Sequence, residues 1–381
     1  MKYVDLGQLV KIQKGKKLDE VYVKSADTLR YIQIEDLRND ENIKYTSSDL
    51  KSATCDKNDV LIAWDGANAG TIGFGLKGAI GSTLAKLTPI KEFFTPFVGR
   101  FLQSKFTYLR NSCTGATIPH ISKSVLIKIQ IPLPPLSEQK RIAEILDKAD
   151  ALRQKNKQLL SAYDELLQST FLDMFGDPVT NSKGWKKVLL AKVITDIVGG
   201  SSFGGEQREL QEDEFGVLKI SSVTTGTFIS TEYKAISSKR ITKPIITPRK
   251  GDLLFSRANT REMVGAVAIV DNDYERLFLP DKLWRIDLNK KEASQFYLHK
   301  LLTNDRFRPE LSKVATGTSG SMLNISKAKL IRLPIPLPPI KLQNQFAQIV
   351  ENIEAQKTLV KASLQESEDL FNGLVQKAFG G

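Results

Sequence analysis

The chain contains a repeat with a constant offset of 204 residues, and this repeat restricts its fold more than any other feature. The matching segments are residues 120–123 and 324–327, the Ile-Pro-Leu-Pro-Pro runs at 131–135 and 335–339, and helical patterns ending in Phe-Gly at 175–176 and 379–380. No insertion or deletion separates the copies over this stretch, and a fixed period indicates one structural unit used more than once. We therefore expect a globular segment followed by a long helix, present twice.

Both long segments show the periodicity of a helix with an apolar stripe. Apolar residues three and four positions apart, sustained for more than three heptads, predict a seam for another helix. The residues predicted to pair the helices are Ile142, Ile145, Ala149, Leu152, Asn156, Leu159, Tyr163 and Leu166 in the first, and Phe346, Ile349, Ile353, Val360, Leu370 and Leu374 in the second. Asn156 lies in mid-seam, where a polar residue either fixes the register or is tolerated beside a water molecule.

The first helix has signals at both of its ends. Pro134 and Pro135 cannot continue a preceding strand, so they predict a stiff, extended approach to the helix. Ser137 is a candidate N-cap, and Glu138 in the first turn favours the helix dipole. Gly176 predicts the end of the helix. A helix of about 38 residues is about 57 Å long. That length exceeds the interior of a small domain, so we expect each helix to act as a spacer.

The two globular segments are predicted to combine short strands with helices. Strand-like runs occur at residues 31–34, 60–63, 127–129, 217–220, 252–255 and 329–331, and helices are expected near 96–110 and 295–303. Strands and helices mixed in this order predict an α+β fold. The expected domain boundaries place globular domains at 1–136 and 177–339, and the long helices at 137–176 and 340–381.

Positive charge is concentrated in the two globular segments. The formal net charge of the chain is +12 at pH 7. Residues 1–136 have a net charge of +6 and residues 177–339 one of +8, whereas each helical segment has a net charge of −1. Two basic lobes joined by near-neutral helices indicate two surfaces for a polyanion. The alternative is that the charge only keeps the protein in solution.

Several kinds of catalytic site cannot be built from this sequence. The two histidines, His120 and His299, lie far apart in the chain, so they predict neither a histidine-based zinc site nor a catalytic pair. No glycine-rich loop precedes the Lys-Ser or Lys-Thr pair of a phosphate-binding site. We therefore expect a chain that has no catalytic residue, metal or cofactor of its own.

The composition is typical of a cytoplasmic protein. Cys55 and Cys113 are the only cysteines, which is too few for a disulfide framework. No apolar run approaches the roughly 18 residues that a membrane span needs. Residues 1–10 lack the apolar core of a signal peptide. We expect a cytoplasmic location and no contact with a membrane.

Two motifs of the first copy resemble those of a known family. They are Ile-Pro-Leu-Pro-Pro-Leu-Ser-Glu-Gln-Lys-Arg-Ile at 131–142 and Phe-Leu-Asp-Met-Phe-Gly-Asp-Pro at 171–178. Together with the repeat, they make the whole chain similar to the specificity subunit of type I restriction–modification enzymes. The second copy differs at its helix start, where Ile-Lys-Leu-Gln at 340–343 replaces Leu-Ser-Glu-Gln.

The resemblance implies that this chain recognises DNA. Each globular segment would be a target recognition domain for one half of a split site in double-stranded DNA, and the two helices would form an antiparallel coiled coil. Two methyltransferase subunits, which bind S-adenosylmethionine, would dock on the chain, and restriction subunits that use ATP and magnesium would join them. An antiparallel pair has an approximate two-fold axis, as B-DNA does, so the lobes would face half-sites about one turn, roughly 34 Å, apart.

Side chains in the loops that leave the strands are the candidates for DNA contact. They are Lys16, Lys17, Trp64, Asp65, Asn68, Thr117, His120 and Lys123 in the first segment, and Lys219, Ser221, Arg257, Asn259, Arg261, Ser319, Ser321, Asn324 and Lys327 in the second. Arginines suit guanine edges and asparagines suit adenine, whereas lysines suit phosphates. Three alternatives stay open: solvated loop residues at any of these positions, a core position for Trp64, and a turn role for His120 and Asn324.

Two other classes of function are compatible with the sequence. One is the recognition part of a restriction–methylation enzyme whose catalytic motifs lie on a separate chain. The other is a structural adaptor, whose helices mediate dimerisation and whose lobes bind proteins. Retention on a heparin or DNA column at moderate salt distinguishes a DNA-binding subunit from an adaptor, because phosphate contacts are salt-dependent.

Overall fold

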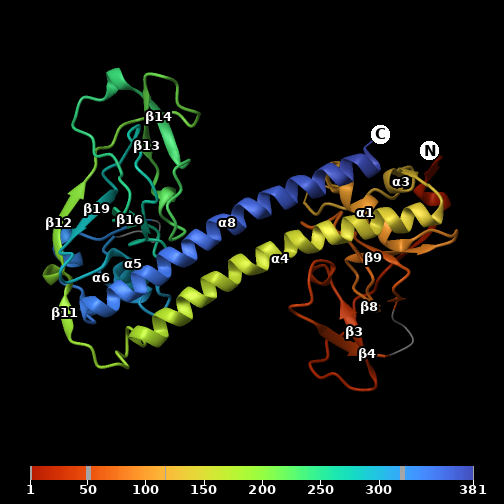
Figure 1. Cartoon of the computed structure of the whole chain (residues 1–381). Coiled ribbons are helices and arrows are strands. Elements are labelled where there is room, and N and C mark those ends of the chain that lie inside the picture. The colour runs from red at the N-terminus through yellow and green to blue at the C-terminus, as the bar shows by residue number, and fades with distance from the viewer. Residues whose placement is uncertain (1, 49–52, 116, 318–321, 381) are drawn as a thin grey trace. The chain divides into compact units, whose positions relative to one another are not determined.

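The computed structural model describes residues 2–48, 53–115, 117–317 and 322–380 (Figure 1). The chain divides into two compact units: the first contains Met1–Gln158 and Lys361–Gly381, and the second contains Leu159–Val360. Two long helices, α4 (Leu136–Phe175) and α8 (Ile340–Phe379), contribute to both units. None of the helices in the described ranges has the length and apolarity that crossing a membrane requires.

The described part of the first unit has two four-stranded sheets and a strand pair. One sheet has the order β2-β9-β6-β7, with strands Val10–Lys14, Leu84–Pro89, Val60–Ala63 and Ile72–Phe74. The other has the order β4-β3-β8-β5, with strands Lys44–Ser47, Thr28–Ile32, Gly78–Ile80 and Thr54–Cys55. Strand β1 (Tyr3–Asp5) pairs with β10 (Gln130–Pro132). The short helices are α1 (Thr95–Ser104), α2 (Phe106–Asn111) and α3 (Lys123–Leu126).

The second unit repeats this arrangement among its described residues. Its sheets are β12-β19-β15-β17, with strands Ile194–Gly199, Leu283–Leu288, Leu253–Ser256 and Val267–Ile269, and β14-β13-β18, with strands Tyr233–Ser237, Glu214–Leu218 and Leu277–Phe278. Its strand pairs are β11 (Lys187–Leu189) with β21 (Pro334–Pro336), and β16 (Ala258–Asn259) with β20 (Leu323–Asn324). Its short helices are α5 (Gln295–Thr303), α6 (Arg308–Val314) and α7 (Lys327–Leu330).

Matching strands of the two units pair in the same register. Ala63 of β6 lies opposite Leu84 of β9, as Ser256 of β15 lies opposite Leu283 of β19. Strands β6 and β15 are buried along their whole length, which explains why each reads as a short apolar run. The sequence repeat is therefore one α+β unit used twice, as predicted.

Two predicted strands were wrong. Residues 123–126 and 327–330 form α3 and α7, and the strands expected at 127–129 and 329–331 begin instead at Gln130 and Pro334. The reason is local capping: in the second unit, the Ser326 hydroxyl accepts a hydrogen bond from the Lys329 amide and starts a helix. The helix expected at 96–110 is two helices, because α1 ends at Ser104 and α2 begins at Phe106.

The start of α4 also differs from the prediction. The helix begins at Leu136, and the Pro135 carbonyl accepts hydrogen bonds from the Glu138 and Gln139 amides. Ser137 therefore lies inside the first turn and is not the N-cap. Glu138 does occupy the first turn, as expected.

The buried seam of α4 follows a different phase from the predicted one. Ile142, Ala149 and Asn156 are buried as expected, and Leu146 and Leu167 are buried beside the stripe. The other half of the predicted stripe, Ile145, Leu152, Leu159 and Leu166, is 37%, 45%, 41% and 47% exposed. The pairing prediction is wrong for these four residues, because the seam uses positions i, i+4 and i+7 where i, i+3 and i+7 were expected. On α8, Phe346 and Ile353 are buried, Ile349, Val360 and Leu374 are half-buried, and Leu370 is 51% exposed.

Asn156 has partners on the other helix. Within the first unit, its side-chain amide donates to the hydroxyls of Ser363 (3.2 Å) and Ser367 (3.4 Å) on α8. A buried polar contact of this kind pairs only when the helices are in register, so it specifies alignment. In the second unit, the Lys357 ammonium on α8 lies 2.7 Å from the Asp164 carboxylate on α4. Asp164 follows Asn156 on α4, whereas its partner Lys357 precedes Ser363 on α8, so the contacts follow the order of an antiparallel pair.

A buried glutamine joins the start of each long helix to its unit. The Gln139 Oε1 accepts from the Phe94 amide (2.9 Å), and its Nε2 donates to the Pro134 carbonyl (2.9 Å). Gln343, 204 residues later, is fully buried; it accepts from the Ser294 amide (2.9 Å) and donates to the carbonyls of Pro338 (2.7 Å) and Glu292 (3.1 Å). These contacts fix the loop before α1 or α5 against the helix start.

We expect Gln343→Leu to lower the free energy of unfolding of the second unit by about 1–3 kcal/mol. Leucine fills a similar volume but leaves a buried amide and two carbonyls without this partner, and unsatisfied buried groups destabilise by that amount. Urea denaturation followed by circular dichroism measures the change. Gln139→Leu is the matched variant for the first unit. Unchanged stability in both would contradict a structural role for the two glutamines.

Candidate nucleic-acid interface

In the first unit, predicted DNA-binding residues converge where β2 and β6 end. Lys14 is the last residue of β2, and Asp65 is the second residue after the end of β6. The Lys14 Nζ lies 3.0 Å from Asp65 Oδ2, and the His120 Nδ1 lies 2.6 Å from Asp65 Oδ1. The main chains of Asp65 and His120 also form an antiparallel bridge. The fold thus brings three segments together into one polar cluster, the Lys14–Asp65–His120 cluster.

Asp65 is the anion at the centre of this cluster. Partial burial raises its pKa, but hydrogen bonds from His120 and Lys14 outweigh the burial, so the pKa of Asp65 lies below its usual value. The carboxylate therefore stays ionised and orients the two donors. The side chains of Lys14 and His120 remain 49% and 48% exposed, which leaves both available to a ligand.

Trp64 belongs to the hydrophobic core of the first unit. Its side chain is only 8% exposed, and the Lys14 ammonium lies 5.8 Å from its ring centroid. The prediction of a direct DNA contact by Trp64 is therefore wrong, and the core alternative holds. The ring instead supports Lys14 through a cation–π contact.

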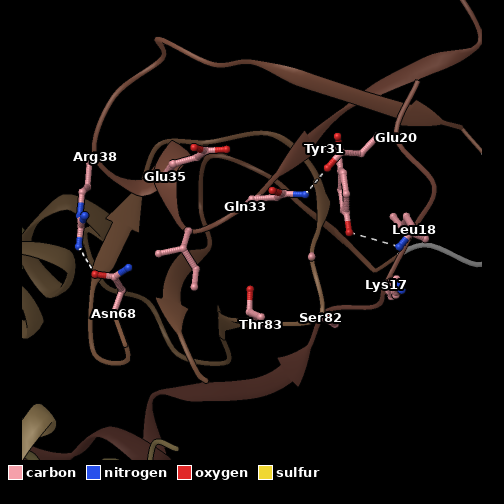
Figure 2. A pocket seen from close by; sticks show the side chains of 12 residues that line it. Lys17, Leu18, Glu20, Tyr31, Gln33, Glu35, Arg38, Asn68, Ser82 and Thr83 are labelled. Carbon is pink, nitrogen blue, oxygen red and sulfur yellow. Dashed lines mark hydrogen bonds between the residues drawn. The ribbon is translucent and has the colours of Figure 1, made fainter. Parts of the chain in front are cut away.

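A polar cleft of about 680 Å³ lies next to the cluster (Figure 2). Lys17 lines one part of it and Asn68 another. The Asn68 Oδ1 accepts a hydrogen bond from Arg38 Nη2 (2.7 Å). Thr83, whose carbonyl accepts from the Trp64 amide, also lines the cleft and connects it to the cluster. The other predicted residues of this unit, Lys16, Thr117 and Lys123, are exposed.

The second unit has a cation–aromatic cluster at the equivalent place. The Arg257 guanidinium donates to the Asp281 carbonyl (3.0 Å), and its Nη1 lies 3.4 Å from Asn324 Oδ1. A salt bridge of 3.3 Å joins Arg257 to the Asp281 carboxylate. Arg257 and the Lys327 ammonium each lie 6.0 Å from the Trp284 ring centroid. Arg257 thus contacts both Asn324 and the Asp281 carboxylate, and it shares the Trp284 ring with Lys327.

The remaining predicted residues of the second unit have varied surroundings. Lys219 and Ser221 both contact the Glu232 carboxylate, at 2.7 Å for the lysine. Asn259 lies in β16, and its side-chain oxygen accepts from the Thr260 amide (2.8 Å). Arg261 is exposed. Ser319 and Ser321 lie outside the described residues.

The two clusters share a main-chain frame but differ in side chains. The Ile121 amide donates to the Trp64 carbonyl (2.9 Å), and the Ile325 amide donates to the Arg257 carbonyl (2.8 Å). Trp64 and Arg257 are therefore equivalent, as are His120 and Asn324 by the repeat. One frame presents Lys14, Asp65 and His120, and the other presents Arg257, Asn324 and Lys327. The surfaces can therefore bind different chemical patterns in equivalent geometry.

Four contributors were missed by the sequence reasoning. Lys14 directly precedes the Gly-Lys-Lys run, so a strand-end search extended by two residues would have found it. Arg38, Asp281 and Trp284 carry no local signal, because only the fold brings them to the predicted loops. Among the described residues, no group of three or more His, Cys, Asp or Glu side chains is placed to hold a metal ion.

Comparisons with known proteins agree with this architecture. The profile of the family described as type I restriction modification DNA specificity domain matches residues 1–162 and 184–368. The specificity subunit of type I restriction enzyme MjaVIII from Methanocaldococcus jannaschii is 27% identical, with 96% of this chain and 88% of that protein covered. The specificity subunit of EcoKI from Escherichia coli is 25% identical, with 92% and 82% covered.

The fold is also found in a solved structure. The S subunit of a type I restriction–modification system from M. genitalium superposes with a TM-score of 0.62 at 16% identity, covering 99% of this chain and 96% of that one. At this identity the likeness concerns the fold alone. The profile match, in contrast, includes two copies and most of the sequence. The chain therefore belongs to the family of type I restriction–modification DNA specificity subunits.

Proposed function

We propose that this chain is the DNA sequence-recognition subunit of a type I restriction–modification complex, and that each globular domain reads one half of a bipartite, asymmetric site. The observation that carries the proposal is the shared frame of the two clusters with different side chains. Equivalent frames suit two half-sites related by a two-fold axis, and different side chains suit different bases. Residues 1–136 and 177–339 are the target recognition domains, and 137–176 and 340–381 are the spacer helices.

The proposed DNA contacts of the two domains divide into two kinds. Arg257 and Asn324 present fixed planar groups that match base edges, whereas Lys14, Lys17 and Lys327 are flexible cations that suit phosphates. The chain itself is non-catalytic. S-adenosylmethionine, ATP and magnesium belong to the methyltransferase and restriction subunits of the complex, which is cytoplasmic.

The exposed apolar residues of α4 provide the docking surface for methyltransferase subunits. Ile145, Leu152, Leu159 and Leu166 recur every seven residues, so they lie on one face of the helix, and each is more than a third exposed. A regular exposed stripe of this kind marks an interface for another helix. Ile145 and Leu152 belong to the first unit and the other two to the second, which suits two methyltransferase subunits, one at each half.

The experiment that tests the proposal combines capture and methylation mapping. The tagged full chain is captured from lysate of its own cell, and the DNA methylation of that cell is mapped with and without the chain. We expect a methyltransferase subunit in the captured material and the loss of a split, asymmetric methylated motif. No methyltransferase and unchanged methylation would refute the proposal and leave the adaptor alternative.

Arg257→Ala tests base reading by the second domain. We expect affinity for duplexes carrying the mapped motif to fall about 5- to 150-fold, which corresponds to about 1–3 kcal/mol. Base preference should relax at one position of one half-site, because a guanidinium that pairs with a base edge discriminates there only. Fluorescence anisotropy with singly substituted duplexes measures both effects.

Lys327→Ala is the matched control for Arg257→Ala. The Lys327 ammonium lies 6.0 Å from the Trp284 ring centroid, the same distance as the Arg257 guanidinium. A lost phosphate contact weakens binding to all sequences and lowers the salt slope by about one. A uniform loss in Arg257→Ala, with all base preferences kept, would show that Arg257 does not read a base.

A further inference from the structure

The segment that follows β2 ends in an exposed apolar tip. Tyr22 is 93% exposed and its neighbour Val23 is 70% exposed, the highest values among the large hydrophobic residues described. Single exposed apolar residues are ordinary, but two adjacent ones in contact with water on nearly all sides indicate a contact that is missing from the isolated chain.

The segment that carries this tip is held in place. The Lys16 amide donates to the Ile80 carbonyl (3.1 Å), and the Leu18 amide donates to the Tyr31 hydroxyl (3.2 Å). Closer to the tip, the Val21 amide donates to the Tyr45 carbonyl (2.8 Å). The sheet therefore sets the position of Tyr22, one residue beyond this last anchor, and little ordering is left to occur on binding.

The tip adjoins the cleft of the candidate interface. Lys17, Leu18 and Glu20 from the same segment line the 680 Å³ cleft, as do Arg38 and Asn68 (Figure 2). The Glu20 carboxylate is engaged by the Lys44 ammonium at 3.2 Å. Lys16, Lys17 and Lys24 of the same segment are exposed, alongside the acidic residues Asp19 and Glu20, so cations suited to phosphates lie on both sides of the tip in the sequence.

The second unit has a polar tip at the equivalent position. Glu206 bridges to Ala235 as Val21 bridges to Tyr45, so Gln207 corresponds to Tyr22 and Arg208 corresponds to Val23. Arg208 is occupied by a two-bonded salt bridge to Glu214, with both distances 2.6 Å. The apolar tip is therefore a property of the first unit alone.

We propose that Tyr22 is a wedge that packs against a base step in the DNA half-site of the first domain, with Val23 beside it. An aromatic ring and a neighbouring aliphatic group at a fixed tip, next to lysines that hold phosphates, are the combination that inserts between or stacks on bases. The inference rests on the proposed function and names the residue through which one half-site is bound differently from the other.

The test uses the full chain in complex with its methyltransferase subunits. Duplexes carry the mapped motif, with 2-aminopurine placed in turn at each position of either half-site, because this base fluoresces when unstacked. We expect a fluorescence increase at one step of a single half-site with the wild-type protein and none with Tyr22→Ala. Affinity should fall about 5- to 150-fold in Tyr22→Ala, as for loss of one stacked base, while the salt slope stays unchanged.

Two control variants separate the wedge from other roles. Tyr22→Phe keeps the ring and should retain both affinity and fluorescence, whereas Gln207→Ala at the equivalent position of the second unit should leave both unchanged. Wild-type affinity and fluorescence in Tyr22→Ala would overturn the wedge and leave the proposed function intact. Loss of methyltransferase subunits from the Tyr22→Ala complex would also overturn it, because the tip would then bind protein. Absence of any motif preference in the wild-type complex would refute the proposed function itself.

Discussion

Replacement of Phe346 by alanine is expected to lower the free energy of unfolding of the second unit by about 3–5 kcal/mol, the usual effect of removing a fully buried aromatic ring. Phe346 on α8 is fully buried. Its ring centroid lies 5.7 Å from that of Phe171 and 5.3 Å from that of Phe175, both on α4. Phe171 and Phe175 also contact Tyr297 of α5, so the cavity would open where three helices meet.

The measurement can be confined to the second unit. Trp64 belongs to the first unit, whereas Trp185 and Trp284 belong to the second, so urea denaturation in a Trp64→Phe background reports the second unit by fluorescence. Leu359→Ala is the matched control, since this residue of the same helix is 64% exposed and should change stability by at most about 0.5 kcal/mol. Equal effects of the two substitutions would contradict the assignment of Phe346 to the core.

Deletion of one heptad from each long helix is expected to shorten the preferred DNA spacer without altering either half-site. Removal of residues 157–163 from α4 and 360–366 from α8 keeps the Asn156–Ser367 pair in the first unit and the Asp164–Lys357 pair in the second. Seven residues correspond to about 10.5 Å of helix. At about 3.4 Å per base pair, the preferred spacer should shorten by about three base pairs.

Methylation mapping in a cell that expresses the shortened chain measures the spacer. Total affinity should also fall, because each base pair removed rotates one half-site about the DNA axis by about a tenth of a turn. Deletion of the heptad from α8 alone is the control, since it shifts the register of α8 against α4 and should abolish specific methylation. A shortened protein that methylates the original motif would contradict the spacer role.

The large features of the fold could be predicted from the sequence because each has a signal that repeats. The 204-residue offset predicted two copies, and an apolar stripe sustained for more than three heptads predicted the long helices. The phase of the seam could not be predicted, because α4 has two apolar stripes: Ile142, Ala149 and Asn156 are common to both, whereas Ile145 and Leu152 belong to the stripe that stays exposed. Only the second helix distinguishes them.

The candidate site was predictable to a similar extent. Asp65, His120, Arg257 and Asn324 were predicted as residues of strand-exit loops; Asn324 lies in β20 instead, but the fold brings each pair together. Their partners were not predictable, since Asp281 lies 24 positions and Trp284 27 positions from Arg257 in the sequence. Contact across a sheet is set by strand order, and strand order has no local signature in the chain.

Helix α8 has a consequence for the order in which the two units can complete their folding. Phe379 is buried in the core of the first unit, with its ring centroid 5.4 Å from those of Phe97 and Phe101. The N-terminal domain therefore leaves the ribosome with an incomplete core, which is completed only after Phe379 has been synthesised. The second unit is continuous in sequence, so it can complete its core first. Loss of the part of α8 that contains Phe379 would thus damage the domain that was synthesised earliest, so the folding of the first domain depends on a segment made more than 200 residues later.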